Sequence, residues 1–259
     1  MFDNKVAPVS TEEGVEVPIL MYHEVKANNL SSISITPYEF EQDLKFIKDN
    51  DYTPVTMQDL INYVYYDISL PEKPIVLSFD DGYYNNYVYA FPLLKKYNVK
   101  IVLSIIGKSS DDFTKICDEN VNYSHMSWKQ VNEMINANCA EVQNHTYNLH
   151  KITKIRYGAH KKWGESLEEY EKVLSDDVEK CQQAVAGYTG TTPNTFTYPY
   201  GSISKESIPV LKKLGFKAAL TCKYGINILR HDPEQLFQLK RISRRHKDNI
   251  GKIIEKAKK

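Results

Sequence analysis

Pro74-Ile75-Val76-Leu77-Ser78-Phe79-Asp80-Asp81-Gly82 is the stretch that decides the fold of this chain. Residues 74–79 form a mostly apolar run typical of a strand, and the carboxylates and the glycine follow where that strand should end. Similar runs alternate with helical patterns along the chain, which predicts an α/β fold of parallel strands joined by right-handed crossovers. Such units close into a barrel or open as a doubly wound sheet. About 250 residues suit a single (β/α) barrel, whose chemistry lies on the loops after its strands.

The expected elements follow from apolar periodicity and from helix-start signals. Strands are expected over residues 17–23, 74–79, 99–106, 140–144, 195–198, 216–221 and near 238–242. Helices are expected after Thr36 and Thr56, over 85–97, 128–138, 164–187 and 204–214, and at the C-terminus. Thr36 is followed by Pro37 and, three residues on, by Glu39, which together predict a capping box. We therefore expect one domain over residues 17–259, preceded by a linker over 1–16.

Composition excludes several classes of partner. The 259 residues have a formal net charge of +0, and 42% are hydrophobic and 25% charged, as in an ordinary globular protein. Nothing favours nucleic acid or an anionic membrane as a partner, and no run approaches the ~18 apolar residues of a membrane span. The first residues lack the apolar core of a signal peptide. The protein is therefore either cytosolic, or a signal or anchor segment is absent from this chain.

The cysteines show no metal-binding spacing. Cys117, Cys139, Cys181 and Cys222 include no C-x-x-C pair, so a zinc knuckle is not expected. They suit either buried thiols or one or two disulfides, and buried thiols are favoured.

A second motif, Asn144-His145-Thr146-Tyr147-Asn148-Leu149-His150, follows the strand-like run 140–144. Seen alone, either motif also suits an ordinary turn, because Asp-Asp-Gly is common in loops and histidines are often surface or core groups. Together they supply one carboxylate and two imidazoles after strands, which is a facial ligand set for a divalent metal. The turn between the histidines would have to bring them together. The other aspartate remains for proton transfer, so the sequence predicts a metal-dependent hydrolase.

These motifs resemble those of a known family. Phe79-Asp80-Asp81-Gly82, His145-Thr146 with His150, and Thr197-Tyr198-Pro199-Tyr200-Gly201 are similar to the successive motifs of the polysaccharide deacetylases, also called carbohydrate esterase family 4 or the NodB-homology domain. The resemblance covers about residues 17–245. Met21-Tyr22-His23 and the five-residue histidine spacing are similar to the branch that deacetylates poly-β-1,6-N-acetylglucosamine. The resemblance implies a distorted (β/α) barrel and metal-dependent removal of N- or O-acetyl groups from glycans.

The resemblance also implies a role for each motif residue. Asp81, His145 and His150 would bind one divalent metal, usually zinc in this family, with cobalt, nickel or iron able to serve. The metal would lower the pKa of its water and polarise the acetyl carbonyl. Asp80 would act as the general base, and the backbone N–H of Tyr200 would help to hold the oxyanion.

The chain departs from the family pattern at two places. Thr197 stands where many members carry an arginine that orients the base, and Arg241 on the expected last strand is either its replacement or a surface ion-pairing residue. The usual general acid is a histidine in a late Leu-x-His. Leu229-Arg230-His231 matches those letters, but residues 227–233 are predicted to form a polar loop. We therefore predict His23 as the general acid, with a core histidine as the alternative.

Tyrosines are the candidates for contact with sugar rings. The chain has 19 of them, and their faces stack on sugars while their hydroxyls form hydrogen bonds. Tyr84, Tyr147 and Tyr198 lie in or beside the motifs and are predicted to touch the substrate, whereas helix packing is the simpler account of Tyr87.

The predicted function is metal-dependent hydrolysis of N-acetyl groups from a β-linked N-acetylglucosamine polysaccharide or oligosaccharide of exopolysaccharide, peptidoglycan or chitin type. An O-acetyl xylan-type esterase uses the same chemistry and stays an alternative, as does a glycan-binding module that has lost turnover. A glycosidase fits poorly, because adjacent Asp80 and Asp81 would have to flank a glycosidic bond at a separation of ~5–10 Å. Such substrates lie outside the cell, so we expect an extracellular or cell-surface monomer whose partner is a glycan.

Overall fold

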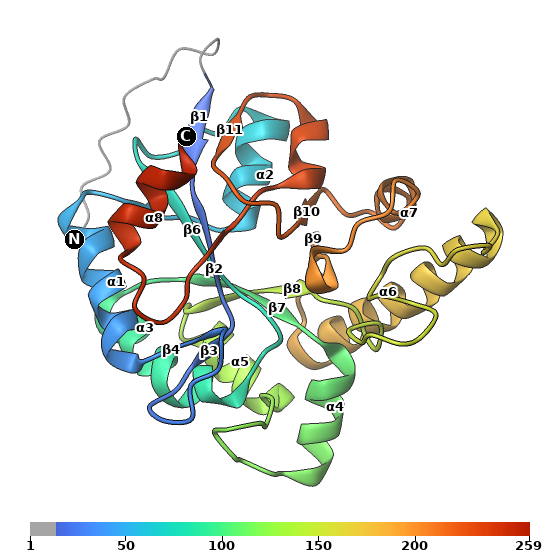
Figure 1. Cartoon of the computed structure of the whole chain (residues 1–259), viewed down its shortest axis with the longest axis horizontal. Helices are drawn as coiled ribbons and strands as arrows, with labels where there is room; N and C mark the ends of the chain where they lie inside the picture. Colours follow the sequence, from blue (N-terminus) through green and yellow to red (C-terminus); the bar gives the residue numbers. More distant parts are fainter. Residues whose placement is uncertain (1–13) are drawn as a thin grey trace.

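A curled sheet of parallel strands forms the centre of the molecule, as shown by a computed structural model that describes residues 14–259 (Figure 1). The eight-stranded sheet has the order β10-β9-β8-β7-β6-β2-β12, with β5 beside β6. Its strands are β2 (Ile19–Tyr22), β5 (Thr53–Pro54), β6 (Pro74–Phe79), β7 (Ile101–Ile105), β8 (Ala140–Asn144), β9 (Thr195–Thr197), β10 (Ala218–Leu220) and β12 (Ile242–Ser243). Backbone hydrogen bonds from Leu239 to Ala219 and from Thr221 to Leu239 join β10 to the segment before β12. The expected distorted (β/α) barrel is therefore confirmed.

Helices surround this sheet (Figure 1). They are α1 (Pro37–Asp49), α2 (Met57–Tyr66), α3 (Phe91–Tyr97), α4 (Gly107–Ile116), α5 (Trp128–Asn136), α6 (Leu167–Thr189), α7 (Ser207–Lys213) and α8 (Ile250–Ala257). Capping boxes start α1, α2, α5 and α6, with Thr36, Thr56, Ser127 and Ser166 as N-caps. No local signal predicted α4, because its N-cap, Ile106, has no capping side chain to mark a helix start.

Two short strands correct the expected boundaries. β1 (Val15–Val17) pairs antiparallel with β11 (Asn227–Leu229). Val15 and Glu16, predicted to belong to a linker over 1–16, are therefore part of a strand, and residues 1–13 lie outside the described part of the chain. Part of the loop predicted over 227–233 is likewise a strand. Val15 and Leu229 are buried in the core, so tertiary packing stabilises strands that are too short to show a periodic pattern.

Three further features lie between these elements. β3 (Glu24–Val25) and β4 (Ser34–Ile35) form a small parallel pair directly after His23. A π-helical turn (Asn86–Ala90) precedes α3, and a 3₁₀ segment (Pro233–Gln238) occupies the start of the predicted last strand. As a result, Arg241 lies just before β12 rather than within it.

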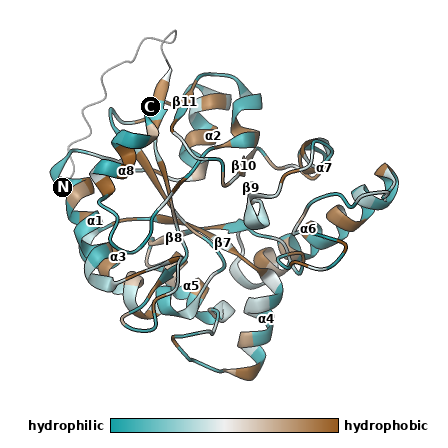
Figure 2. Ribbon diagram, in the orientation of Figure 1, coloured by the Kyte–Doolittle hydropathy of each residue, from teal (hydrophilic) through white to brown (hydrophobic). Residues whose placement is uncertain are grey.

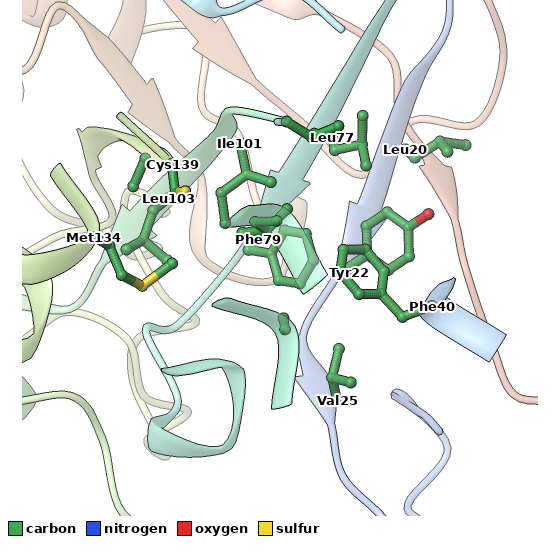
Figure 3. Close-up of a cluster of buried hydrophobic side chains, with 14 of the residues drawn as sticks. Leu20, Tyr22, Val25, Phe40, Leu77, Phe79, Ile101, Leu103, Met134 and Cys139 are labelled. Atoms are coloured by element: carbon green, nitrogen blue, oxygen red, sulfur yellow. The ribbon is translucent and has the colours of Figure 1, made fainter. Parts of the chain in front are cut away.

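Alternation along the strands separates two apolar layers. One layer packs between the sheet and the helices and includes Leu20, Tyr22, Leu77, Phe79, Ile101 and Leu103, with Phe40 of α1 (Figure 3). The other fills the inside of the barrel and includes Ile19, Val76, Val102, Ala218 and Leu220. Figure 2 shows apolar central strands surrounded by helices whose outer faces are largely polar. Because side chains alternate with a period of two, Ser78 and Asp80 continue the inner row that begins at Val76.

Two further observations bear on the expectations for membranes and cysteines. Within residues 14–259 no helix has the length and apolar character that crossing a membrane requires. All four cysteines are free thiols, with Cys139 and Cys181 buried and Cys117 and Cys222 exposed. Buried thiols were therefore the right expectation for two of the four.

Candidate active site

The C-terminal ends of β6 and β8 bring together one carboxylate and two imidazoles. Asp81 Oδ1 lies 3.3 Å from His145 Nε2 and 3.1 Å from His150 Nε2. The three possible ligand atoms lie within 4.8 Å of one another. Asp81 and Thr146 both have left-handed backbones, with φ of 70° and 71°, so the chain turns sharply after each strand. These turns bring together side chains that are not on one face of a regular element.

The charge state of these groups fits a bound cation. Asp81 Oδ1 is buried and accepts no hydrogen bond within the described part of the chain. His145 Nδ1 lies 2.7 Å from the carbonyl oxygen of Thr197, so donation there leaves the Nε2 lone pair facing Asp81. Burial opposes ionisation of Asp81, yet the imidazoles hold the pKa of its carboxyl below the usual range. Burial lowers the pKa of His150 to about 4, so its imidazole is neutral. The pKa of His145, by contrast, is raised by the neighbouring carboxylates of Asp81 and Asp80, against the effect of its burial. One carboxylate and two imidazoles suit a divalent transition metal, which takes the place of the proton on His145 Nε2 when it binds.

Two aromatic residues that the sequence analysis did not select support Asp81. His125 Nδ1 lies 2.8 Å from the carbonyl oxygen of Asp81, and the rings of His125 and Tyr83 stack with centroids 4.8 Å apart. Burial, with the charge of Asp81, raises the pKa of Tyr83 and keeps its hydroxyl protonated. The tyrosine cluster after the aspartates was a signal for Tyr83. His125 lies 44 residues from Asp81, and no local pattern links the two.

Asp80 forms a bidentate ion pair with Arg241. Arg241 Nη1 and Nη2 donate to the two carboxylate oxygens at 2.7 and 2.8 Å, and Arg241 Nε donates to the Thr221 carbonyl oxygen at 2.8 Å. Arg241 is only 1% exposed, so the alternative of a surface ion pair is wrong. Burial would raise the pKa of Asp80, but the guanidinium outweighs it and holds that pKa below the usual range. Asp80 is therefore ionised and oriented.

The two candidate acids lie at opposite ends of the barrel. His23 follows β2, and its Nε2 lies 4.0 Å from Asp80 Oδ2. Asn86 Nδ2 donates to the His23 carbonyl oxygen at 2.7 Å, which fixes the backbone there. His231 follows β11, and its Nδ1 lies 3.0 Å from the Tyr63 carbonyl oxygen and 2.9 Å from Asp67 Oδ1. β11 pairs with β1, which precedes β2, so His231 is near the strand starts and away from Asp80.

A tight turn places Tyr200 beside the second histidine. Pro199–Gly201 form a 3₁₀ turn in which Tyr200 is left-handed, with φ of 58°. A Cβ on Gly201 would lie 2.7 Å from the backbone nitrogen of Cys222, so only glycine fits there. The centroid of the Tyr200 ring is 4.5 Å from that of His150.

The three tyrosines predicted to touch substrate lie in different surroundings. Tyr198 is fully buried and its hydroxyl bonds to Ser207, so its burial contradicts the predicted contact with a sugar. The Tyr147 hydroxyl donates to Asp111, and Lys180 lies 4.1 Å from its ring centroid, which commits this side chain to packing. Tyr84 is partly exposed and remains a candidate.

Comparison with known proteins agrees with this geometry. The family model described as polysaccharide deacetylase matches residues 67–219, which include the motifs from Asp80 to Tyr200. The chain belongs to the polysaccharide deacetylase family. The resemblance noted in the sequence motifs is therefore confirmed.

Several relatives carry more specific names. The chain is 25% identical over 228 residues to the poly-beta-1,6-N-acetyl-D-glucosamine N-deacetylase of Escherichia coli (strain K12), covering 80% of this chain and 34% of that protein. It is 27% identical over 203 residues to the enzyme of the same name from Staphylococcus aureus (strain MSSA476), covering 76% and 64%. The chain thus spans less than two thirds of the length of these two relatives.

A solved structure is similar over most of both chains. The structure of IcaB from Ammonifex degensii has a TM-score of 0.73 and 26% sequence identity, covering 88% of this chain and 91% of that one. The chain described here and IcaB therefore share one fold, which is built on the curled parallel sheet.

Proposed function

We propose that this chain is a metal-dependent deacetylase that removes N-acetyl groups from a β-linked N-acetylglucosamine polymer. The observation that carries the proposal is the pair of adjacent aspartates with different partners. Asp81 presents to two imidazoles a buried oxygen that accepts no hydrogen bond from residues 14–259, whereas Asp80 is held by Arg241. One carboxylate thus suits a cation and the other suits proton transfer.

Asp81, His145 and His150 would hold the metal, which supplies Lewis acidity for the acetyl carbonyl and lowers the pKa of a water. Zinc is the proposed ion, and cobalt, nickel or iron suit the same ligands. Thr197 and His125 orient this set by hydrogen bonding at His145 Nδ1 and at the Asp81 carbonyl oxygen.

The proposed proton transfers use the residues around Asp80. Asp80 accepts a proton from the water while the oxygen of that water forms a bond with the acetyl carbon. The backbone N–H of Tyr200 donates to the carbonyl oxygen as negative charge develops there. His23 donates a proton to the leaving nitrogen as the carbon–nitrogen bond breaks, and the products are acetate and a free amine.

The choice of substrate rests on the relatives named as poly-beta-1,6-N-acetyl-D-glucosamine N-deacetylases. Their name supports an N-acetylated glucosamine polymer over an O-acetylated xylan. A binding module without turnover is disfavoured, because Asp80, Arg241 and His23 serve proton transfer and add nothing to holding a glycan. Such a polymer lies outside the cell, so we also propose an extracellular or cell-surface location. We further propose that the enzyme is a monomer.

The decisive experiment measures acetate release from β-1,6-linked N-acetylglucosamine oligomers. Chelated protein should be inactive, and activity should return with zinc, cobalt, nickel or iron. Asp81→Ala should neither bind one equivalent of metal nor regain activity. Stoichiometric metal binding without acetate release from the oligomers, but with release from acetylated xylan, would overturn the proposed substrate. Failure to bind any metal would overturn the site itself.

A further inference from the structure

The connection from β8 to α6 carries His150 and, beyond it, contacts the Pro199–Gly201 turn. After His150 it forms a small hairpin in which Ile152 bridges Tyr157 and Gly158 N–H donates to the Lys151 carbonyl oxygen at 3.1 Å. The hairpin places the Tyr157 ring 5.1 Å from the Tyr200 ring, centroid to centroid. Tyr157, which belongs to none of the sequence motifs, thus packs against Tyr200, whose ring in turn packs against the proposed metal ligand His150.

A close backbone contact fixes this hairpin. Gly158 has a φ of 55°, and a Cβ built on it would lie 3.0 Å from the Pro199 carbonyl oxygen and 3.3 Å from Tyr200 Cδ2. The hairpin and the Pro199–Gly201 turn therefore meet without a side chain between them. This contact holds Tyr157 in place next to Tyr200.

Both rings are open to solvent. Tyr157 is 46% exposed and Tyr200 is 38% exposed, whereas the side chain of His150 behind them is 17% exposed. The two tyrosine planes are inclined at 47°, so they form a corner rather than one flat face. Exposed aromatic rings beside a reaction centre suit an apolar ligand face, because their own hydrophobic area is left uncovered.

We propose that Tyr157 and Tyr200 form an aromatic corner that binds a pyranose ring of the glycan adjacent to the sugar being deacetylated. This inference rests on the proposed function and adds to it a second sugar-binding position. The carbon–hydrogen face of a pyranose packs on an aromatic face, so the rings rather than the hydroxyls would supply the contact. The corner would hold the polymer while the acetyl group reaches Asp81.

The test uses the metal-loaded enzyme and a β-1,6-linked N-acetylglucosamine hexamer. Tyr157→Ala should raise KM about fivefold with little change in kcat, because the lost stacking acts on binding rather than on the reaction. Tyr157→Phe should restore a KM near that of the wild type, since the ring and not the hydroxyl supplies the stacking. Tyr66→Ala is the matched control, because Tyr66 is 56% exposed and is the last residue of α2. That helix leads into the start of β6, whereas the active site lies at the other end of the strand. An unchanged KM for Tyr157→Ala would overturn the proposal.

Two further measurements separate this proposal from folding defects and from the proposed function. Tyr157→Leu keeps an apolar side chain in the hairpin without a π face and replaces the alanine variant if that one does not fold. Hexamer binding to an Asp80→Asn protein, with and without Tyr157→Ala, tests the corner without turnover. Weaker hexamer binding by the double variant would support the corner, whatever the outcome of the activity assay. Failure of every metal to restore acetate release would refute the proposed function and leave the corner standing. Equal binding would reject the corner.

Discussion

Arg241 binds both carboxylate oxygens of Asp80 across 161 residues of sequence. The pair links the segment before β12 to the end of β6, and both side chains are almost completely buried. A buried bidentate pair fixes the direction in which each carboxylate oxygen points. It also keeps Asp80 charged within the barrel, where an isolated carboxylate would be protonated.

Replacing Arg241 should therefore affect both stability and activity. Arg241→Met should lower the free energy of unfolding by about 3–5 kcal/mol, because it leaves Asp80 buried without its counter-ion. The acid limb of the kcat/KM profile should move to higher pH, since the guanidinium that lowers the pKa of Asp80 is gone. Urea unfolding and pH-dependent acetate release measure the two effects. The control Asp80→Asn/Arg241→Met should recover part of the stability; an equally large loss in it would contradict the ion-pair explanation.

The two histidines at opposite ends of the barrel form a matched pair. His23→Asn should bind one equivalent of metal but lower kcat by about 10²–10⁴-fold, the usual contribution of a general acid. His231→Asn should retain full activity, because that ring lies against Tyr63 and Asp67. Metal content and kcat decide the matter. Equal kcat values for the two variants would remove His23 from the mechanism.

The contact beneath the aromatic corner can be tested with two glycines. Gly158 and Gly164 are both left-handed, with φ of 55° and 75°, but a Cβ would meet nothing within 4 Å at Gly164. Alanine should cost about 1–2 kcal/mol at either position because of the backbone conformation. Gly158→Ala should lose more stability and should also raise KM, because its methyl group separates the hairpin from Pro199. Thermal unfolding and KM compare them; identical losses with unchanged KM would show that the contact has no role.

The C-terminal segment should be sensitive to acid through Glu39. Partial burial opposes its ionisation, but hydrogen bonds from the backbones of Thr36 and Lys247 hold its pKa at about 2, below the usual 4.5 of a glutamate. This lowered pKa contributes stability above pH 4.5 that is lost as the pH falls toward 2. Glu39→Gln should therefore lower Tm at pH 7, and the difference from the wild type should shrink between pH 4.5 and 2. A difference independent of pH would assign the effect to capping alone.

Local rules predicted those elements whose signals lie within a few residues of each other. The capping boxes at Thr36 and Thr56 are present, and strand 74–79 has the predicted bounds. Such signals depend on contacts within a few residues, which the sequence displays directly. β11 and the π-helical turn at Asn86–Ala90 were missed, because packing against distant strands and side chains stabilises them.

The sequence by itself determined that parallel strands alternate with helices and which motifs resemble those of the family, and that resemblance proposed the carboxylate and histidines for a metal. Each depends on residue type and short spacing after a strand. Only the tertiary structure decided that Arg241 is the partner of Asp80, that His23 rather than His231 lies near it, and that Tyr157 stands beside Tyr200. These relationships arise when the sheet curls and brings its distant strand ends and loops together. No spacing along the chain encodes them, because the physical contact is across the barrel.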